Sequence, residues 1–213
     1  MNQIRTDVLI IVCFAAVFVF VGVLVSSTMI IRAHAQLQTT TNTTNTKATT
    51  FLTYKDKQGR FTISYPSSGW EVTPAKNRFE DFVVSFRNLD TLSSLVIQLN
   101  KIDYPGNDVE SLMSAMPDMA RIGTPNFELI QEVECKKYTI DGHKACSMIN
   151  TQTPDYISEK KIAMMTVGSI INGTSYMFLY GAKPDNFDTY LPIIDKMIGS
   201  FKITANATTT TTS

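Results

Sequence analysis

The sequence contains few of the side chains that catalyse reactions or hold metal ions. Its 213 residues include three cysteines, two histidines and one tryptophan. The histidines, His34 and His143, lie far apart in the chain, and no CxxC, HExxH or GxSxG motif occurs. Nucleophilic catalysis needs a nucleophile beside a positioned base, and zinc sites need closely spaced thiol or imidazole ligands. The sequence therefore favours a non-catalytic protein without a cofactor, and we expect His143 to be an exposed turn residue.

The chain also lacks an excess of charge of either sign. It has 19 Lys and Arg residues against 19 Asp and Glu residues. Leaving out Arg5, Asp7 and Arg32, which flank a hydrophobic segment, 17 basic and 18 acidic residues remain. A nucleic-acid-binding surface would need a marked basic excess. The balance therefore excludes nucleic acid and other polyanions as expected partners.

Residues 8–31 form a run of 24 residues without a charge. About 20 apolar residues suffice to cross a bilayer, whereas the apolar core of a signal peptide is usually about 7–15 residues long. The length thus favours a membrane anchor, while Ala33-His34-Ala35 resembles a signal-peptidase site and favours cleavage after Ala35. Residues 1–35 are therefore predicted to be either a signal peptide or a membrane anchor. Arg5 and Arg32 lie on opposite flanks, so the positive charges do not fix the orientation, and a cytoplasmic domain on the same anchor is the alternative to export.

Two polar tracts flank the remaining chain. Residues 36–53 are rich in Thr and Asn, and residues 204–213 are rich in Thr. Such segments have too few apolar side chains to fold, so we predict a disordered stalk and a disordered tail. Residues 54–203 remain as one globular domain. Three Asn-x-Thr triplets are candidate glycosylation sites and support an extracytoplasmic location, membrane-anchored or secreted: Asn42, Asn172 and Asn206.

The strongest structural signal is Asn172-Gly173, which separates two apolar runs, residues 162–171 and 174–182. Asn-Gly favours the type I′ turn of a two-residue hairpin loop. The turn predicts these cross-strand pairs: Ile171 with Thr174, Ser169 with Tyr176, Val167 with Phe178, and Met165 with Tyr180. Because both faces of this hairpin are mostly apolar, we expect it in the middle of a sheet that is covered above and below.

The other elements follow from apolar spacing and turn residues. Strands are predicted at 61–65, 70–72, 82–86, 95–99, 127–134 and 200–203, with a second hairpin, 135–140 and 143–150, around Asp141-Gly142. A helix begins after Asn107 or Asp108 and is interrupted by Pro117. After a turn or cap at 184–186, a second apolar stripe follows at helical spacing, with Pro192 suited to a first helical position and Gly199 to the C′ site: Phe187, Tyr190, Leu191, Ile194, Met197 and Ile198. The expected fold class is α+β, an antiparallel sheet flanked by helices on both faces.

Three segments resemble the PsbP-like domain of the Mog/PsbP-like superfamily, named for an extrinsic protein of the oxygen-evolving photosystem. They are FTISYPSSGW at 61–70, YTIDGHKA at 138–145, and residues 187–201, which end in IGSF. The resemblance covers residues 54–203 and implies an α-β-α sandwich with an accessory, non-catalytic role. No functional residue of the family is matched. The hydrophobic segment and the Thr-rich stalk are similar to those of archaeal PsbP-like proteins displayed outside the membrane.

Sulfur-containing side chains provide the remaining candidates. A two-residue loop at Asp141-Gly142 would pair Cys135 with Met148, which makes Cys135 and Cys146 diagonal neighbours about 7 Å apart. A disulfide between them would therefore need a β-bulge or a strong local twist; the alternative is two free thiols in the core. Met113, Met116 and Met119 could offer thioethers to Cu(I), which prefers soft ligands, although methionine more often fills core gaps.

These patterns predict an extracytoplasmic, membrane-tethered accessory or binding module, attached to the membrane through residues 8–31. Its expected partner is a protein of a membrane or envelope complex at the outer face of the membrane. The alternative function is a carrier of a small hydrophobic molecule in a pocket between sheet and helix, or of Cu(I) on Met113, Met116 and Met119. An enzyme is the least favoured class, because the catalytic residue groupings are missing.

Overall fold

The computed structural model describes residues 49–74, 81–102, 108–124, 126–153 and 161–204. The predicted hydrophobic segment, most of the stalk, the tail, and the sequons at Asn42 and Asn206 lie outside these ranges. Within them, neither helix is long and apolar enough to cross a membrane.

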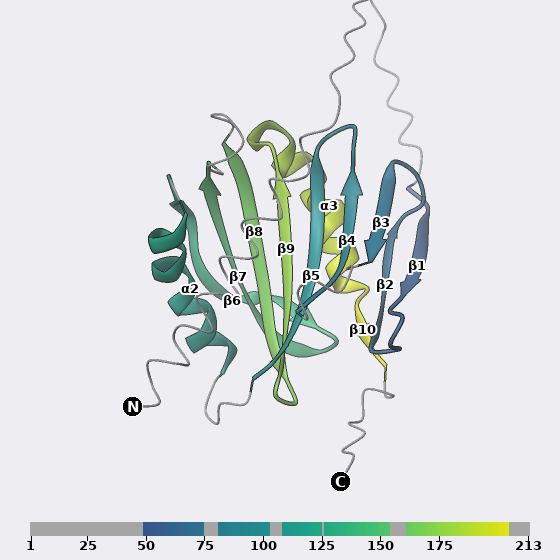
Figure 1. Ribbon diagram of the computed structural model, residues 1–213, viewed down its shortest axis with the longest axis horizontal. Helices are drawn as coiled ribbons and strands as arrows, with labels where there is room; N and C mark the ends of the chain where they lie inside the picture. The colour runs from purple at the N-terminus through teal and green to yellow at the C-terminus, as the bar shows by residue number, and fades with distance from the viewer. Residues whose placement is uncertain (1–48, 75–80, 103–107, 125, 154–160, 205–213) are drawn as a thin grey trace, which may run out of the picture.

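Ten strands and two helices make up the described chain (Figure 1). The strands are β1 (Phe51–Lys55), β2 (Phe61–Pro66), β3 (Trp70–Pro74), β4 (Phe82–Asn88), β5 (Ser93–Lys101), β6 (Glu128–Ile140), β7 (His143–Gln152), β8 (Ile162–Ile171), β9 (Thr174–Ala182) and β10 (Lys202–Ile203). The helices are α2 (Val109–Gly123) and α3 (Pro184–Gly199). Strand β1 begins three residues before the domain boundary predicted at Tyr54.

Seven strands form the main sheet in the order β3-β4-β5-β9-β8-β7-β6, and every pair is antiparallel. Strands β8 and β9 occupy the middle, as predicted, and all four predicted pairs occur. Asn172 and Gly173 both have positive φ, 50° and 73°, which is the backbone of a type I′ turn. The hairpin is buried on both faces, with only the residues around its turn and Ile162 half-buried or exposed. The predicted centre of the fold is therefore confirmed.

One face of the main sheet packs against helix α3 and a second, smaller sheet. Strands β1 and β10 both pair with β2 to form that three-stranded sheet. Phe201, just after α3, stacks on Phe61 and meets Phe178 edge-on. All three rings are completely buried. This aromatic cluster joins β2, β9 and the chain that follows α3 into the larger of two hydrophobic cores.

The opposite face of the sheet contacts helix α2, which lies over β6, β7 and β8 (Figure 1). The antiparallel sheet and its two helices agree with the predicted α+β class. Among the described residues, α2 covers only the part of the sheet face formed by β6, β7 and β8. Two predictions about the helices are wrong. Pro117 lies inside α2 and does not end it, and Pro192 lies inside α3, which begins at Pro184, and not at a first helical position. Buried Ile194, Met197 and Ile198 beyond Pro192 hold α3 to the sheet, whereas in α2 Pro117 itself is buried and Ala120 is the one buried residue after it.

Asp56 and Arg60 fix the turn between β1 and β2. Nε and Nη2 of Arg60 donate to the two carboxylate oxygens of Asp56 at 2.7 and 3.1 Å, and Asp56 is only 7% exposed. Burial alone would raise the pKa of Asp56, but the hydrogen bonds from Arg60 and Gln58 outweigh it and lower the pKa below the ordinary 3.8. The charged carboxylate is thus stabilised by folding.

We expect the Asp56→Asn variant to be less stable than the wild type at neutral pH and less sensitive to acid. A carboxylate whose pKa is lower in the folded chain stabilises fully above its unfolded pKa, and this contribution disappears as the pH falls through the folded value. Urea unfolding between about pH 6 and pH 2 measures the difference. Asp118→Asn is the control, because its pair with Arg121 is exposed and such pairs contribute little. Parallel pH profiles for wild type and Asp56→Asn would contradict the assignment.

Candidate binding site

Helix α2 begins where the sequence places its cap. The Asp108 side chain accepts a hydrogen bond from the backbone N–H of Ser111 at 2.9 Å, which satisfies one of the free donors of the first turn. The sheet-facing side of the helix is apolar, and its buried residues are Val109, Met113, Met116, Pro117 and Ala120. An ion pair of 2.7 Å between Glu110 and Lys144 also links α2 to β7, but both side chains are exposed. The buried stripe is therefore what holds α2 in place.

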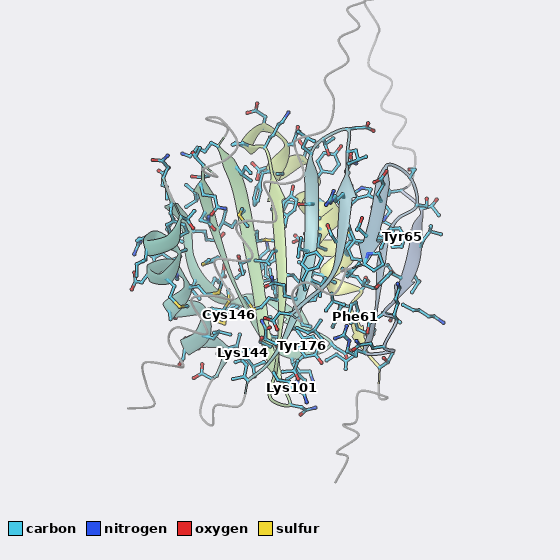
Figure 2. All side chains as sticks on the ribbon, in the orientation of Figure 1. Phe61, Tyr65, Lys101, Lys144, Cys146 and Tyr176 are labelled. Atoms are coloured by element: carbon cyan, nitrogen blue, oxygen red, sulfur yellow. A yellow bond between two sulfur atoms is a disulfide. The ribbon has the colours of Figure 1, made fainter. Side chains whose placement is uncertain are left out.

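Beneath α2 lies a small core built mostly of sulfur-containing side chains. Its buried members are Val109, Met113, Met116, Cys146, Met148 and Met177. Half-buried residues around it include Met119 and Cys135. Figure 2 shows Cys146 in this region, close to α2. Methionine is flexible and polarisable, so it fills irregular gaps between a helix and a sheet. The sulfur-rich core is the part of the structure with the most distinctive chemistry.

Gly168 of β8 is the centre of this core. Across the sheet it faces Cys146 on β7 and Met177 on β9. A Cβ atom at Gly168 would lie 2.8 Å from the sulfur of Met113 and 2.8 Å from the sulfur of Met177. The two methionine sulfurs therefore occupy the space that a side chain would fill, and they lie no more than twice 2.8 Å apart. Glycine at this position allows sulfur atoms from α2 and β9 to meet above β8.

Cys135 and Cys146 form a disulfide between β6 and β7. The pairing extrapolated from the Asp141-Gly142 turn, Cys135 with Met148, is wrong. The register holds from Ile140 to Tyr138 and then shifts, so that Glu134 pairs with Ser147. Three residues of β6, 135–137, thus stand opposite Cys146 alone. This bulge brings Cys135 level with Cys146, and their Cα atoms are 3.9 Å apart.

A pocket adjoins the sulfur-rich core between α2 and the sheet. It is lined by Gln98, Met116, Ala120, Phe127, Met148, Asn150, Met164, Thr166, Met177 and Leu179. Its volume is about 20 Å³, which is room for about one water molecule. A hydrophobic cargo could enter only if α2 moved away from the sheet. The pocket therefore gives no support to the predicted carrier of a hydrophobic molecule.

The three methionines predicted to hold Cu(I) lie on α2 in different surroundings. Met113 is completely buried above Gly168, whereas Met116 lines the pocket. Met119 is half-buried, and it lies about 120° around the helix from Met113 because each residue turns about 100°. A site formed by these three residues stays a prediction. The sequence analysis did not select Met177 as a ligand. The available signal was Gly168, because a glycine inside a strand can indicate that atoms of another element approach closely.

Other predicted site residues lie at exposed turns. Asn172 is exposed at the β8–β9 turn, and its glycosylation stays a prediction. His143 is exposed after the β6–β7 turn. Among the described residues, no three side chains of His, Cys, Asp or Glu are grouped closely enough to hold a metal ion.

Two tyrosines have strongly raised pKa values that serve the fold. Burial, followed by the hydrogen bond to Asp195 at 2.7 Å, raises the pKa of Tyr138 well above its ordinary value. Burial likewise raises the pKa of Tyr180, whose hydroxyl donates to the carbonyl of Phe187 at 2.9 Å. Both hydroxyls therefore stay protonated and tie α3 to the sheet.

Comparisons of sequence and of structure gave different results. No protein-family profile matches the chain, and no characterised protein matches it in sequence. Its structure is similar to that of PsbP from the cyanobacterium Synechocystis, with a TM-score of 0.52 and 19% identity over 75% of this chain and 95% of that one. The fold is thus that of PsbP-like domains.

Two further solved structures have the same fold. The Ran-binding protein Mog1p of Saccharomyces cerevisiae gives a TM-score of 0.51 at 11% identity, covering 73% of this chain and 96% of its own. LpqN, involved in cell envelope biogenesis of Mycobacterium tuberculosis, gives 0.51 at 13% identity, covering 74% of this chain and 92% of its own. The chain therefore has a PsbP/Mog1-like fold, and identities this low establish the fold alone.

Proposed function

We propose that this chain is a non-catalytic, extracytoplasmic PsbP-like module, tethered to the membrane through residues 8–31, that binds a protein partner in a membrane or envelope complex. The observation that carries the location is the Cys135–Cys146 disulfide. Disulfides form and persist in oxidising compartments and are rare in the cytosol. The polar stalk and the candidate glycosylation site at Asn172 support the same location. The proposal also includes an archaeal type of PsbP-like protein, because the hydrophobic segment and the stalk resemble those of archaeal members.

The proposed contact surface is the corner between α2 and β6. Ile122 is 85% exposed in the last turn of α2, and Ile130 is 58% exposed near the start of β6. Phe127, on the connection between them, is half-buried, with the Arg121 guanidinium 6.0 Å from its ring centre. Exposed aliphatic side chains beside an aromatic ring and an arginine are typical of protein-binding surfaces. Two of the proteins with this fold have names that state a binding or envelope role, Mog1p and LpqN, and this supports a partner for this chain too.

Crosslinking of the full chain in its native membrane, followed by mass spectrometry, tests both parts of the proposal. We expect crosslinks from the α2–β6 corner to one recurrent protein and their loss in the Ile122→Lys and Ile130→Lys variants. Lysine is tolerated at a helix C-terminus and on an edge strand, so these variants should fold. Leu89→Lys is the matched control, because Leu89 is 52% exposed on a different turn.

Two results would overturn the proposal. Crosslinks that survive in both lysine variants, or that disappear equally in Leu89→Lys, would remove the α2–β6 corner as the binding surface. Modification of the domain by a membrane-impermeant lysine reagent on intact cells is expected for an extracytoplasmic domain. Complete protection of its exposed lysines would place the domain in the cytoplasm.

A further inference from the structure

The sulfur atoms around Gly168 come from three separate elements of the chain. Met113 reaches it from α2 and Met177 from β9, and both sulfurs lie 2.8 Å from the position of a Cβ atom on Gly168. Cys146 on β7 is the cross-strand partner of Gly168. Opposed residues on neighbouring strands have Cβ atoms about 4.5–5.5 Å apart on the same face. The Cys146 side chain therefore belongs to the same small volume as the two thioethers, and the packing of this core agrees.

We propose that this volume is a Cu(I) site that the disulfide keeps closed. In the oxidised protein the sulfur of Cys146 is bonded to Cys135 and cannot act as a thiolate ligand. Once it is reduced, Cys146 supplies one thiolate beside the thioethers of Met113 and Met177. Thiolate and thioether are the soft ligands that select Cu(I). This site shares only Met113 with the three-methionine alternative, and it is independent of the proposed protein partner.

The charges in the site favour one thiolate over two. Cys146 and Met113 are completely buried, and Met177 is 4% exposed. A net charge in such surroundings is unfavourable, whereas one Cu(I) and one thiolate cancel. Cys135 is half-buried at the edge of the cluster, so it keeps some contact with solvent. It is then the cysteine through which a reductant opens the disulfide and an oxidant closes it again.

Opening of the disulfide and binding of Cu(I) conserve atoms and electrons. A dithiol reductant supplies two electrons and two protons, the bond between Cys135 and Cys146 breaks to give two thiols, and the reductant becomes a disulfide. Cu(I) then replaces the thiol proton of Cys146, which passes to solvent. One Cu(I) bound should therefore release one proton. No change in the oxidation state of copper is involved.

The test uses the full chain in detergent without oxygen, with Cu(I) offered as its bicinchoninate complex. All proteins carry Cys13→Ser, because that cysteine lies in the hydrophobic segment and could bind copper itself. We expect the oxidised protein to leave the complex intact and the dithiol-reduced protein to remove one Cu(I) per chain. The Cys135→Ala variant, in which Cys146 is always free, should take up one Cu(I) without any reductant. Cys146→Ala should take up none under either condition.

Substitutions of single methionines identify the thioether ligands. Met113→Leu and Met177→Leu keep the volume of the side chain, and each is expected to weaken Cu(I) binding by about tenfold or more. Met119→Leu, on the same helix, is the matched control and should bind like the parent. The sulfur-only coordination expected at the bound copper can be read from its X-ray absorption edge, which does not depend on how stable a variant is.

Three outcomes would overturn the site. The first is equal Cu(I) uptake by oxidised and reduced protein, and the second is uptake by Cys146→Ala equal to that of Cys135→Ala. The third is a loss in Met119→Leu as large as the loss in Met113→Leu. None of these results bears on the crosslinking experiment, so the copper site and the protein-binding role can fail separately.

Discussion

Removal of the disulfide by the double substitution Cys135→Ala and Cys146→Ala is expected to lower the free energy of unfolding by about 3 kcal/mol. The bond closes a chain segment with a sequence separation of 11 residues. Its main effect is to restrict the unfolded chain, and a loop of this length corresponds to a value near the middle of the usual range. Urea denaturation of the full chain in detergent measures the change. Wild type with a dithiol should lose the same amount.

The matched control for this experiment is the alanine variant itself with and without reductant. Its midpoint should not respond to the dithiol, because no bond remains to be reduced. A wild-type midpoint that is likewise unchanged by the dithiol would show that the disulfide does not stabilise the folded chain. Amide hydrogen exchange adds a local measurement: we expect faster exchange in β6 than in β8 after reduction, because β6 is an edge strand with a disturbed ladder.

Substitution of Gly168 by alanine is expected to lower the free energy of unfolding by about 1–3 kcal/mol. The new methyl group would lie 2.8 Å from the sulfur atoms of Met113 and Met177, so both side chains must leave their present positions. Both belong to the same tightly packed core beneath α2. The strain therefore spreads to the contact between α2 and the sheet. Chemical denaturation followed by circular dichroism measures the loss.

Gly181→Ala is the control, because Gly181 lies on the same face of the same hairpin. The atoms nearest to its Cβ position are 3.9 Å away, which is ordinary contact distance. Replacing a strand glycine by alanine without a clash usually stabilises by about 0.5–1 kcal/mol. We therefore expect opposite signs for the two alanine variants. Equal effects would mean that the methionine sulfurs do not fill the space at Gly168.

The centre of the fold could be predicted from the sequence because its signals are local. The turn at Asn172-Gly173 determines the register of β8 and β9, and apolar residues on both faces require cover on both sides. The same reasoning failed at β6. The turn at Asp141-Gly142 sets the register only as far as Tyr138, and the ladder shifts beyond it, first where a covalent bond joins Cys135 to Cys146. Local turn chemistry carries no information about that bond.

The candidate site was harder to predict because it is tertiary. Met113, Met116 and Met119 stand out in the sequence as a group on one helix, but Met177 enters only because β9 places it beside Gly168. The two prolines failed for a related reason. Propensity opposes Pro117 inside a helix, yet α2 continues past it, with Met116 and Pro117 themselves and then Ala120 buried against the sheet. Spacing along one element cannot report what another element contributes.

The small sheet contains β1, the first strand that a pull on the N-terminal part of the chain would reach. Its strand β1 follows directly from the N-terminal part of the chain and pairs with β2 from Phe51, opposite Pro66, to Lys55, opposite Thr62. A force pulling Phe51 away from that end would open these pairs one after another, which resists far less than shearing them all together. The seven-stranded sheet shares no strand with β1. Tension on the proposed anchor would thus reach β1 before the seven-stranded sheet.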